Sequence, residues 1–186
     1  MQGPSVTIPS LLLDACALIN FAASRRFDEL ALVHGGFVLV DLVAEEAHFV
    51  RKGGPGEDAS DREEIDLEPL IGAGRLTIVS AATDQELNSF IQFATVLGDG
   101  ESMTLAVALH RRFGVVTDDR KASRIAASNG IKVLTTLDVL RAWEQSACPS
   151  QSEVRAALVD LQERGCYVPH RSHPLRSWWE ERMGAE

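Results

Sequence analysis

Apolar residues along the chain form two patterns, short continuous runs and longer segments with helical spacing. The runs have the length of buried strands, and the spaced segments are typical of amphipathic helices. Strands are predicted at residues 7–13, 37–40, 75–80, 115–117 and 132–134. Helices are predicted at 15–23, 26–33, 42–50, 84–96, 100–112, 121–128, 152–164 and 174–183, with another from Thr136 or Asp138 to Trp143. This alternation predicts an α/β fold, a parallel sheet flanked by helices.

Two segments interrupt the alternation. Residues 51–68 contain Gly-Gly-Pro-Gly and many acids, which predicts a solvated loop with an exposed helix that adds little to the core. Residues 148–150, Cys-Pro-Ser, read as a linker. We therefore expect one domain at residues 1–146 and a C-terminal helical extension at 147–186.

Composition narrows the class of protein. The net charge of −9 excludes a general nucleic-acid coat, which needs positive charge to displace counterions. The negative net charge is still compatible with an enzyme whose pocket concentrates carboxylates around a metal ion. Three cysteines without a C-x-x-C pair predict reduced thiols and a cytoplasmic protein, and no stretch is long and uncharged enough to span a membrane.

Carboxylates recur at the ends of the predicted strands and the starts of the helices. Asp14 follows the first strand, and Glu45 and Glu46 lie near the start of the helix after the second. Glu101 opens a later helix, whose following strand ends in Asp118-Asp119. Because strand C-termini and the next helix N-termini meet at one edge of a parallel sheet, we expect these acids to converge.

Converging carboxylates repel one another, and a divalent cation would remove the conflict. Their hard oxygen ligands suit Mg²⁺ or Mn²⁺, which can activate water and bind a phosphoryl oxygen. Any single acid could instead cap a helix or complement its dipole. Asp14 is the hardest to explain in that way. Apolar residues precede and follow it in the sequence, and burying a carboxylate without a partner is costly.

Four acidic blocks carry a family resemblance. They are Leu13-Asp14-Ala15-Cys16-Ala17-Leu18-Ile19-Asn20, Val43-Ala44-Glu45-Glu46, Leu97-Gly98-Asp99-Gly100-Glu101-Ser102 and Val116-Thr117-Asp118-Asp119-Arg120. In order and spacing they resemble the blocks of PIN-domain ribonucleases. The tail around Arg164-Gly165-Cys166-Tyr167-Val168 is similar to that of PIN proteins related to bacterial VapC-type toxins.

The resemblance implies an endoribonuclease dependent on Mg²⁺ or Mn²⁺ that hydrolyses RNA phosphodiester bonds. A small antitoxin protein would be its partner if it is the toxin of a toxin–antitoxin pair, and we expect a homodimer. By position, the catalytic and metal-binding acids are Asp14, Glu46, Glu101 and Asp118, with Glu45, Asp119 and Thr117 as auxiliary residues. Glu45 competes with Glu46 for one ligand position, and Asp119 competes with Asp118.

Three further interpretations stay open. Arg120, Lys121 and Arg124 lie just beyond the acids and could receive RNA phosphates, or they could be solvated helix charges. Cys166, His170 and His173 lie close together, but this spacing lacks a fourth zinc ligand. A PIN-like fold could also serve as a non-catalytic binding scaffold; that all four acid positions are filled argues against it.

Overall fold

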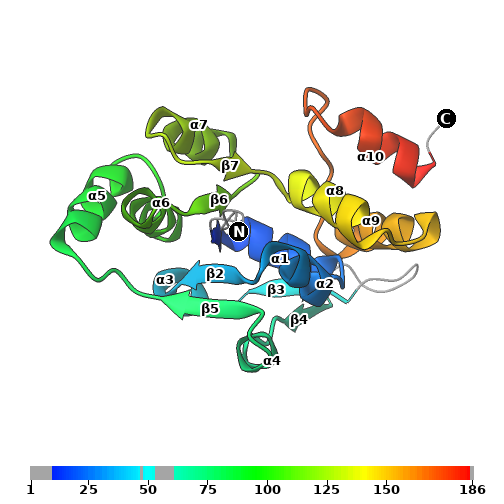
Figure 1. The fold of residues 1–186 in the computed structure, drawn as a ribbon, viewed down its shortest axis with the longest axis horizontal. Coiled ribbons are helices and arrows are strands. Elements are labelled where there is room, and N and C mark those ends of the chain that lie inside the picture. Colours follow the sequence, from blue (N-terminus) through cyan, green and yellow to red (C-terminus); the bar gives the residue numbers. More distant parts are fainter. Residues whose placement is uncertain (1–9, 47, 53–60, 185–186) are drawn as a thin grey trace, which may run out of the picture.

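In a computed structural model, the structure describes residues 10–46, 48–52 and 61–184. Figure 1 presents the fold. Its strands are β1 (Leu11–Leu13), β2 (Phe37–Val40), β3 (Phe49–Arg51), β4 (Arg62–Glu64), β5 (Leu76–Val79), β6 (Gly114–Val116) and β7 (Val133–Leu134). Its helices are α1 (Ala15–Ala23), α2 (Phe27–His34), α3 (Asp41–Ala44), α4 (Glu68–Gly72), α5 (Asp84–Ala94), α6 (Asp99–Arg111), α7 (Arg120–Ser128), α8 (Thr136–Ala147), α9 (Gln151–Arg164) and α10 (Arg176–Met183).

The main sheet has five parallel strands in the order β5-β2-β1-β6-β7, which confirms the predicted α/β fold with its flanking helices. After β1 the chain adds β2 and β5 on one side, and it later adds β6 and β7 on the other. The direction of strand addition therefore reverses at β1 and β6. In open α/β sheets, ligands bind outside the carboxyl ends of the strands at such a switch point.

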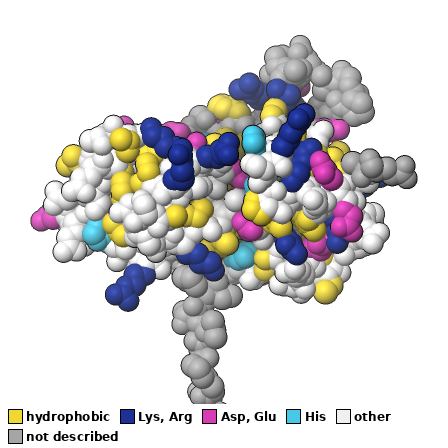
Figure 2. Space-filling model, turned by 90° about the horizontal axis from the view of Figure 1, so that it is seen from above, with side chains coloured by type: hydrophobic (Ala, Val, Ile, Leu, Met, Phe, Trp, Pro, Cys, Tyr) yellow, Lys and Arg dark blue, Asp and Glu magenta, His cyan; other side chains and the backbone are white. Residues whose placement is uncertain are grey.

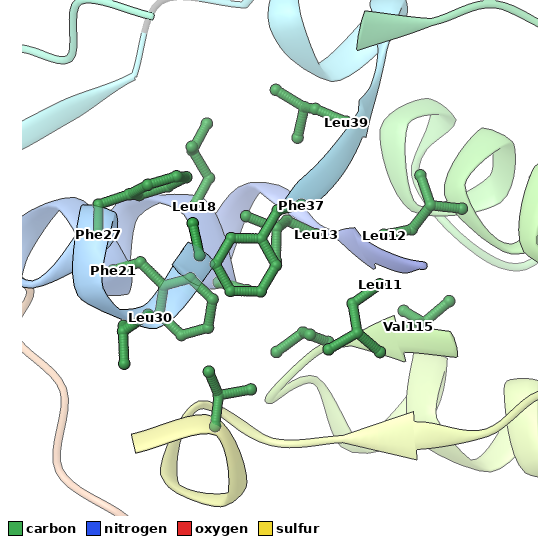
Figure 3. Close-up of a cluster of buried hydrophobic side chains, with 14 of the residues drawn as sticks. Leu11, Leu12, Leu13, Leu18, Phe21, Phe27, Leu30, Phe37, Leu39 and Val115 are labelled. Carbon is green, nitrogen blue, oxygen red and sulfur yellow. The ribbon is translucent and has the colours of Figure 1, made fainter. Parts of the chain in front are cut away.

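The central strand β1 is buried on both faces, as its unbroken run of leucines requires. Figure 1 shows α5 and α6 on one side of the sheet and α1, α2, α8 and α9 on the other. On the latter side Phe21, Phe27 and Phe37 form an aromatic cluster with ring centroids 5.1 to 6.2 Å apart (Figure 3). This packing fixes α1, and with it the end of β1, against the neighbouring strand.

The predicted helix over residues 42–50 is wrong. Helix α3 ends at Ala44, and the chain continues into β3, which pairs antiparallel with β4. The imidazole of buried His48 contacts the carbonyl oxygen of Val43 at 2.5 Å, which takes up a carbonyl that a longer helix would use. The predicted exposed helix within residues 51–68 is likewise replaced by strand β4, whose residues are exposed as expected. Residues 53–60 of that segment, and residues 7–9 of the first predicted strand, lie outside the described residues.

Two element ends also differ from the sequence prediction. Helix α6 begins at Asp99 rather than Gly100, and Gly98 is its N-cap. The helix ends before Arg112, which adopts φ +56°, and Gly114 is the first residue of β6 rather than the helix terminator. A Cβ on Gly114 would lie 2.8 Å from the Leu11 side chain, so this glycine allows β6 to approach β1 closely.

The C-terminal helices pack against the rest of the chain. Helix α9 buries Val154, Leu158 and Leu161 in the same hydrophobic core as the sheet. The guanidinium of buried Arg164 donates to the carbonyl oxygens of Arg51 and Ala23 and pairs with Glu63, which ties the tail to the β3–β4 hairpin. The division into a domain at 1–146 and an extension at 147–186 stays a prediction. None of the helices in the described ranges is long and apolar enough to cross a membrane.

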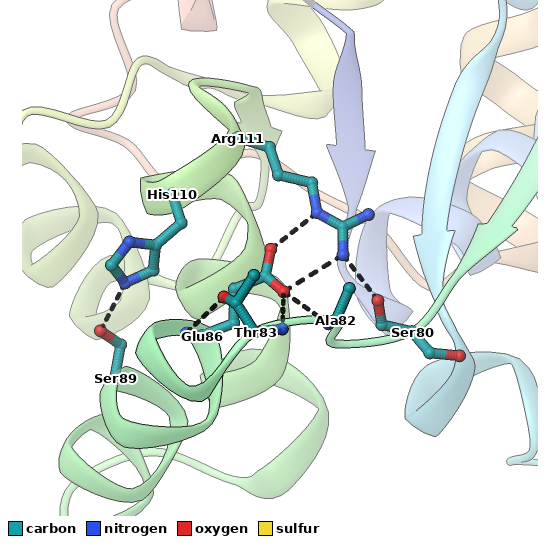
Figure 4. Close-up of polar contacts among 7 residues, drawn as sticks. All are labelled: Ser80, Ala82, Thr83, Glu86, Ser89, His110 and Arg111. Atoms are coloured by element: carbon teal, nitrogen blue, oxygen red, sulfur yellow. Dashed lines mark hydrogen bonds and ion pairs between the residues drawn. The ribbon is translucent and has the colours of Figure 1, made fainter.

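An ion pair between Glu86 and Arg111 joins α5 to α6 (Figure 4). The Glu86 carboxylate is 2% exposed and accepts from Arg111 Nε at 2.7 Å and from the backbone N–H of Ala82 and Thr83 at 2.6 and 3.1 Å. Arg111 also donates to the Ser80 carbonyl at 2.6 Å. The hydrogen bond from Arg111 is the largest of the causes that lower the pKa of Glu86 from 4.5 to about 2.

We therefore predict that Glu86→Gln lowers the free energy of unfolding by about 2 kcal/mol, because a buried hydrogen-bonded charge is removed and its donors lose an acceptor. The depressed pKa makes this contribution fully present above pH 4.5 and lost as the pH falls through about 2. Urea unfolding at pH 7 measures the difference. As a control, Glu29→Gln removes the more exposed Arg26–Glu29 pair and should cost less than about 0.5 kcal/mol. Equal costs for the two variants would contradict the prediction.

Candidate functional site

Asp14 lies where β1 ends and α1 begins, at the switch point of the sheet. Its backbone N–H donates to Val116 of β6 at 3.2 Å, and its Oδ1 accepts from the Ala17 N–H at 2.6 Å as the N-cap of α1. The side chain is 3% exposed, and within the described residues its Oδ2 has no hydrogen-bond partner. Capping thus explains one carboxylate oxygen and leaves the other buried without a donor.

Asp118 follows β6 on the other side of the switch point, and protein donors surround its carboxylate. Oδ1 accepts from the Thr136 N–H and from the Tyr167 hydroxyl, both at 3.2 Å. Oδ2 accepts from Asn20 Nδ2 at 3.1 Å and from the Thr136 hydroxyl. Burial raises the pKa of Asp118, and these hydrogen bonds oppose the rise. Four donors therefore fix the orientation of this carboxylate.

The neighbouring Asp119 has a different local role. It is the N-cap of α7, and its Oδ1 accepts from the N–H groups of Lys121 and Ala122 at 2.7 and 2.6 Å. The hydroxyl of buried Thr117 accepts from the Asp119 N–H at 3.1 Å, and hydrogen bonding between the Thr117 and Asp14 side chains lowers the pKa of that carboxyl. Of the two adjacent aspartates, Asp118 is the one that faces α1, α8 and the tail.

Glu101 and Glu46 both lie near the start of α6. Glu101 lies in the first turn, and its Oε2 accepts from the Gly98 N–H at 3.3 Å, so it also serves as a cap. A Cβ on Gly100 would lie 3.7 Å from Glu46 Oε1 and 2.9 Å from the Val43 side chain. Glycine at this position lets α3 approach α6 closely. Glu46 thereby lies near the helix start that carries Glu101, and Glu45 is the C-cap of α3; both glutamates are exposed.

Electrostatic coupling connects three of the predicted acids. Burial raises the pKa of Asp14 from 3.8 to about 7, and the charges of Asp118 and Glu101 raise it further, against the lowering effect of Thr117 and the Ala17 N–H. The pKa of Cys16 is raised to about 11, first by burial and then by Asp14, Asp118, Glu101 and Asp119. The charges of Asp118 and Glu101 therefore raise the pKa of both Cys16 and Asp14.

Sequence reasoning assigned no role to three side chains that hold Asp118: Asn20, Thr136 and Tyr167. Asn20 is buried on α1 and bridges Asp118 and the Thr136 hydroxyl, with both distances 3.1 Å. One signal was available, because Asn20 is a polar residue within an otherwise apolar helix. Nothing in the sequence pattern pairs Tyr167 with Asp118, 49 residues away.

The predicted RNA-binding residues divide into two groups. Arg120 and Arg124, on the first turns of α7, line a cavity of about 650 Å³ together with Thr117 and Asp118. Lys121 turns elsewhere, since its Nζ donates to the carbonyl oxygen of Val96. The structure therefore brings two of the three basic residues, Arg120 and Arg124, into a cavity that Asp118 also lines.

The residues weighed as a zinc site take part in local hydrogen bonds instead. His170 Nδ1 accepts from the Ser172 N–H at 3.2 Å, and His173 Nδ1 accepts from the Leu175 N–H at 3.0 Å. Throughout the described part of the chain, no group of three or more His, Cys, Asp or Glu side chains is placed so that it could hold a metal ion. Cys166 is a free, exposed thiol.

The acidic edge nonetheless fits a hard divalent cation in its chemistry. Its donors are all carboxylate oxygens, the ligands that Mg²⁺ and Mn²⁺ prefer. Within the described part of the chain, Asp14 Oδ2 has no hydrogen-bond partner and is the open position, while both Asp118 oxygens already accept hydrogen bonds. Binding of a cation at this edge would require side chains to adjust. Asp14 would be stabilised most, because its buried Oδ2 would gain a partner.

Comparison with known protein families matches residues 10–174 to a family model described as a PIN domain. The match extends over all five strands of the sheet and into the segment before α10. No curated protein and no solved structure matches the chain.

The raised pKa of Asp14 predicts how the stability of the metal-free protein depends on pH. A carboxyl whose pKa is higher in the folded state stabilises the fold fully below pH 3.8, and this contribution is lost as the pH rises through about 7. In EDTA, the free energy of unfolding should therefore fall by roughly 2 kcal/mol between pH 5 and pH 7. Asp14→Asn should flatten this slope, as measured by urea unfolding. The same slope in parent and variant would contradict the burial of an ionisable Asp14.

Proposed function

Because the chain belongs to the PIN-domain family, we propose that it is a metal-dependent endoribonuclease that hydrolyses RNA phosphodiester bonds with Mg²⁺ or Mn²⁺. PIN domains are typically nucleases and commonly metal-dependent ribonucleases. The observation that carries the proposal is the buried Asp14 Oδ2 at the switch point, which has no hydrogen-bond partner among the described residues and belongs to a carboxylate coupled to the charges of Asp118 and Glu101.

In this proposal Asp14, Glu46, Glu101 and Asp118 would hold the ion. A divalent cation supplies positive charge for a phosphoryl oxygen and lowers the pKa of the attacking water. A bound cation would favour the carboxylate form of Asp14 over the protonated acid. Hydrogen bonds from Asn20, Thr136 and Tyr167 orient the Asp118 carboxylate. Hydrogen bonding with Thr117 favours the ionised form of Asp14.

Glu46 is the better candidate of the two adjacent glutamates. Its carboxylate lies near Gly100 and hence near the helix turn that carries Glu101, whereas Glu45 is the C-cap of α3; both side chains are exposed. Asp118 is likewise the better candidate over Asp119, whose Oδ1 is committed to the start of α7. The homodimer and the small antitoxin stay predictions.

Cleavage of a mixed single-stranded RNA pool in Mg²⁺ or Mn²⁺ tests the proposal. We predict that EDTA abolishes cleavage and that Asp14→Asn lowers the rate at least about a hundredfold, since the amide keeps the shape but loses a charged ligand. The control Asp84→Asn, at an exposed acid in the first turn of α5, should cut like the parent. Cleavage that survives EDTA, or an Asp14→Asn variant as active as the parent, would overturn the mechanism.

Two glutamine variants resolve the glutamate assignment. We predict that Glu46→Gln impairs both cleavage and Mn²⁺ binding, and that Glu45→Gln affects neither. Metal binding is measured apart from activity as the rise in melting temperature with Mn²⁺ concentration. The opposite ranking would transfer the role to Glu45. A folded parent protein that shows neither Mn²⁺ stabilisation nor RNA cleavage would favour the non-catalytic scaffold.

A further inference from the structure

A pocket of about 500 Å³ lies beside β5, which is an edge strand of the main sheet. Ile78 of β5 and Ile71 of α4 line it, together with Leu67 from the segment between β4 and α4. We call it the α4 pocket. In Figure 1, α4 lies below β5, at the opposite end of the molecule from α7 and α10. Of the four acids proposed as metal ligands, Glu46 alone lines this pocket, so it is largely separate from the nuclease edge.

The edge of β5 that faces away from β2 has no strand neighbour among the described residues. The Phe37 N–H donates to the Arg75 carbonyl at 2.9 Å, which fixes the phase of the parallel ladder. Because the backbone groups of successive residues in a strand point to opposite sides, Thr77 and Val79 pair with β2, and the N–H and C=O of Ile78 face the free edge. Strand β5 therefore offers main-chain hydrogen-bonding groups beside the pocket, the arrangement to which an extended peptide adds as a further strand.

Carboxylates accompany the apolar lining of the α4 pocket. Four acids contribute to it and, among the described residues, no Lys or Arg does: Glu46, Glu64, Asp66 and Glu68. All four are exposed, and within that part of the chain none of them forms an ion pair. Figure 2 looks onto the side of the molecule that carries α7 and α10, where Lys and Arg side chains gather. The pocket therefore presents uncompensated negative charge around an apolar surface.

Backbone hydrogen bonds hold the walls of this pocket in place. The Ile65 N–H donates to the His48 carbonyl at 2.8 Å, which fastens the start of the β4–α4 segment to the residue before β3. The Arg75 N–H donates to the Leu70 carbonyl, also at 2.8 Å, and so fixes α4 against the start of β5. The pocket is therefore formed before a partner arrives, which lowers the entropic cost of association.

We propose that the α4 pocket and the free edge of β5 bind an extended segment of a partner protein in which apolar and basic residues alternate. A second copy of this chain is disfavoured, because two-fold pairing of β5 with itself would place equal sets of acids against each other. In an extended strand every second side chain points the same way, so apolar residues can contact Leu67, Ile71 and Ile78 while the basic residues reach the carboxylates. The inference goes beyond the proposed nuclease function and does not rest on it.

Fluorescence anisotropy with labelled synthetic peptides tests the surface. The probe has blocked ends and the sequence Val-Lys-Val-Arg-Val-Lys, and a control peptide of the same composition places its three valines together. We expect the alternating peptide to bind at least about tenfold more tightly, because only its side chains match the two-residue period of a strand. N-methylation of one set of alternate amides in the probe should weaken binding about tenfold, since it removes the donors to β5, and N-methylation of the other set should not.

Two double variants of the protein test the charge of the pocket. Glu64→Gln combined with Glu68→Gln should weaken binding of the alternating peptide about tenfold at low salt, and less at high salt, because exposed ion pairs are screened. The matched control, Asp84→Asn combined with Glu163→Gln, neutralises two exposed acids on α5 and α9 and should bind like the parent. Equal affinities of the two double variants would contradict recognition by these carboxylates.

The outcomes distinguish this inference from the proposed function. Equal binding of the alternating and control peptides, or equal effects of the two N-methylated sets, overturns strand addition at β5 whether or not the protein cleaves RNA. Asp14→Asn should bind the alternating peptide like the parent, so a protein that binds it and never cleaves RNA supports the inference and overturns the nuclease. Self-association of the parent that excess alternating peptide reverses would assign the surface to a second copy and overturn the partner assignment.

Discussion

The burial of the Asp14 carboxylate is the constraint on which the rest of this molecule depends. Asp14 follows the central strand directly, so it cannot reach solvent without disturbing the most buried part of the sheet. Its Oδ1 is satisfied by α1, and its Oδ2 has no partner among the described residues. A protein that needed only a helix cap there could use serine at lower cost, since a hydroxyl carries no charge to desolvate.

Asp118, the second aspartate at the switch point, shows how the fold stabilises a buried carboxylate with hydrogen bonds. Asp118 receives donors from α1, from the start of α8 and from the tail, through Asn20, Thr136 and Tyr167. Three segments far apart in the sequence thus converge on one carboxylate. The hydrophobic core positions these segments, so the geometry of the acidic edge depends on packing as much as on the acids themselves.

The sheet and most helices could be predicted because their signals are local: the apolar runs at 11–13 and 37–40 and the helical spacing of α6 lie within single segments. The electrostatic coupling of Asp14 to Asp118 and Glu101 was also accessible, since strand ends and the following helix starts lie at one edge of a parallel sheet. The β3–β4 hairpin was missed because its pairing is non-local and β4 is charged and exposed. The Tyr167–Asp118 contact and the diversion of Lys121 to Val96 depend on tertiary packing, which no residue spacing encodes.

The contact between Tyr167 and Asp118 also has a consequence in time. A ribosome releases the chain from its N-terminus, and the segments that emerge first can begin to fold first. All five strands of the sheet precede residue 167, so the sheet can assemble while Asp118 still lacks its tail donor. The set of donors around this carboxylate closes only after the tail has left the exit tunnel. Newly made molecules therefore pass through an interval in which the scaffold is formed and its acidic edge is unfinished.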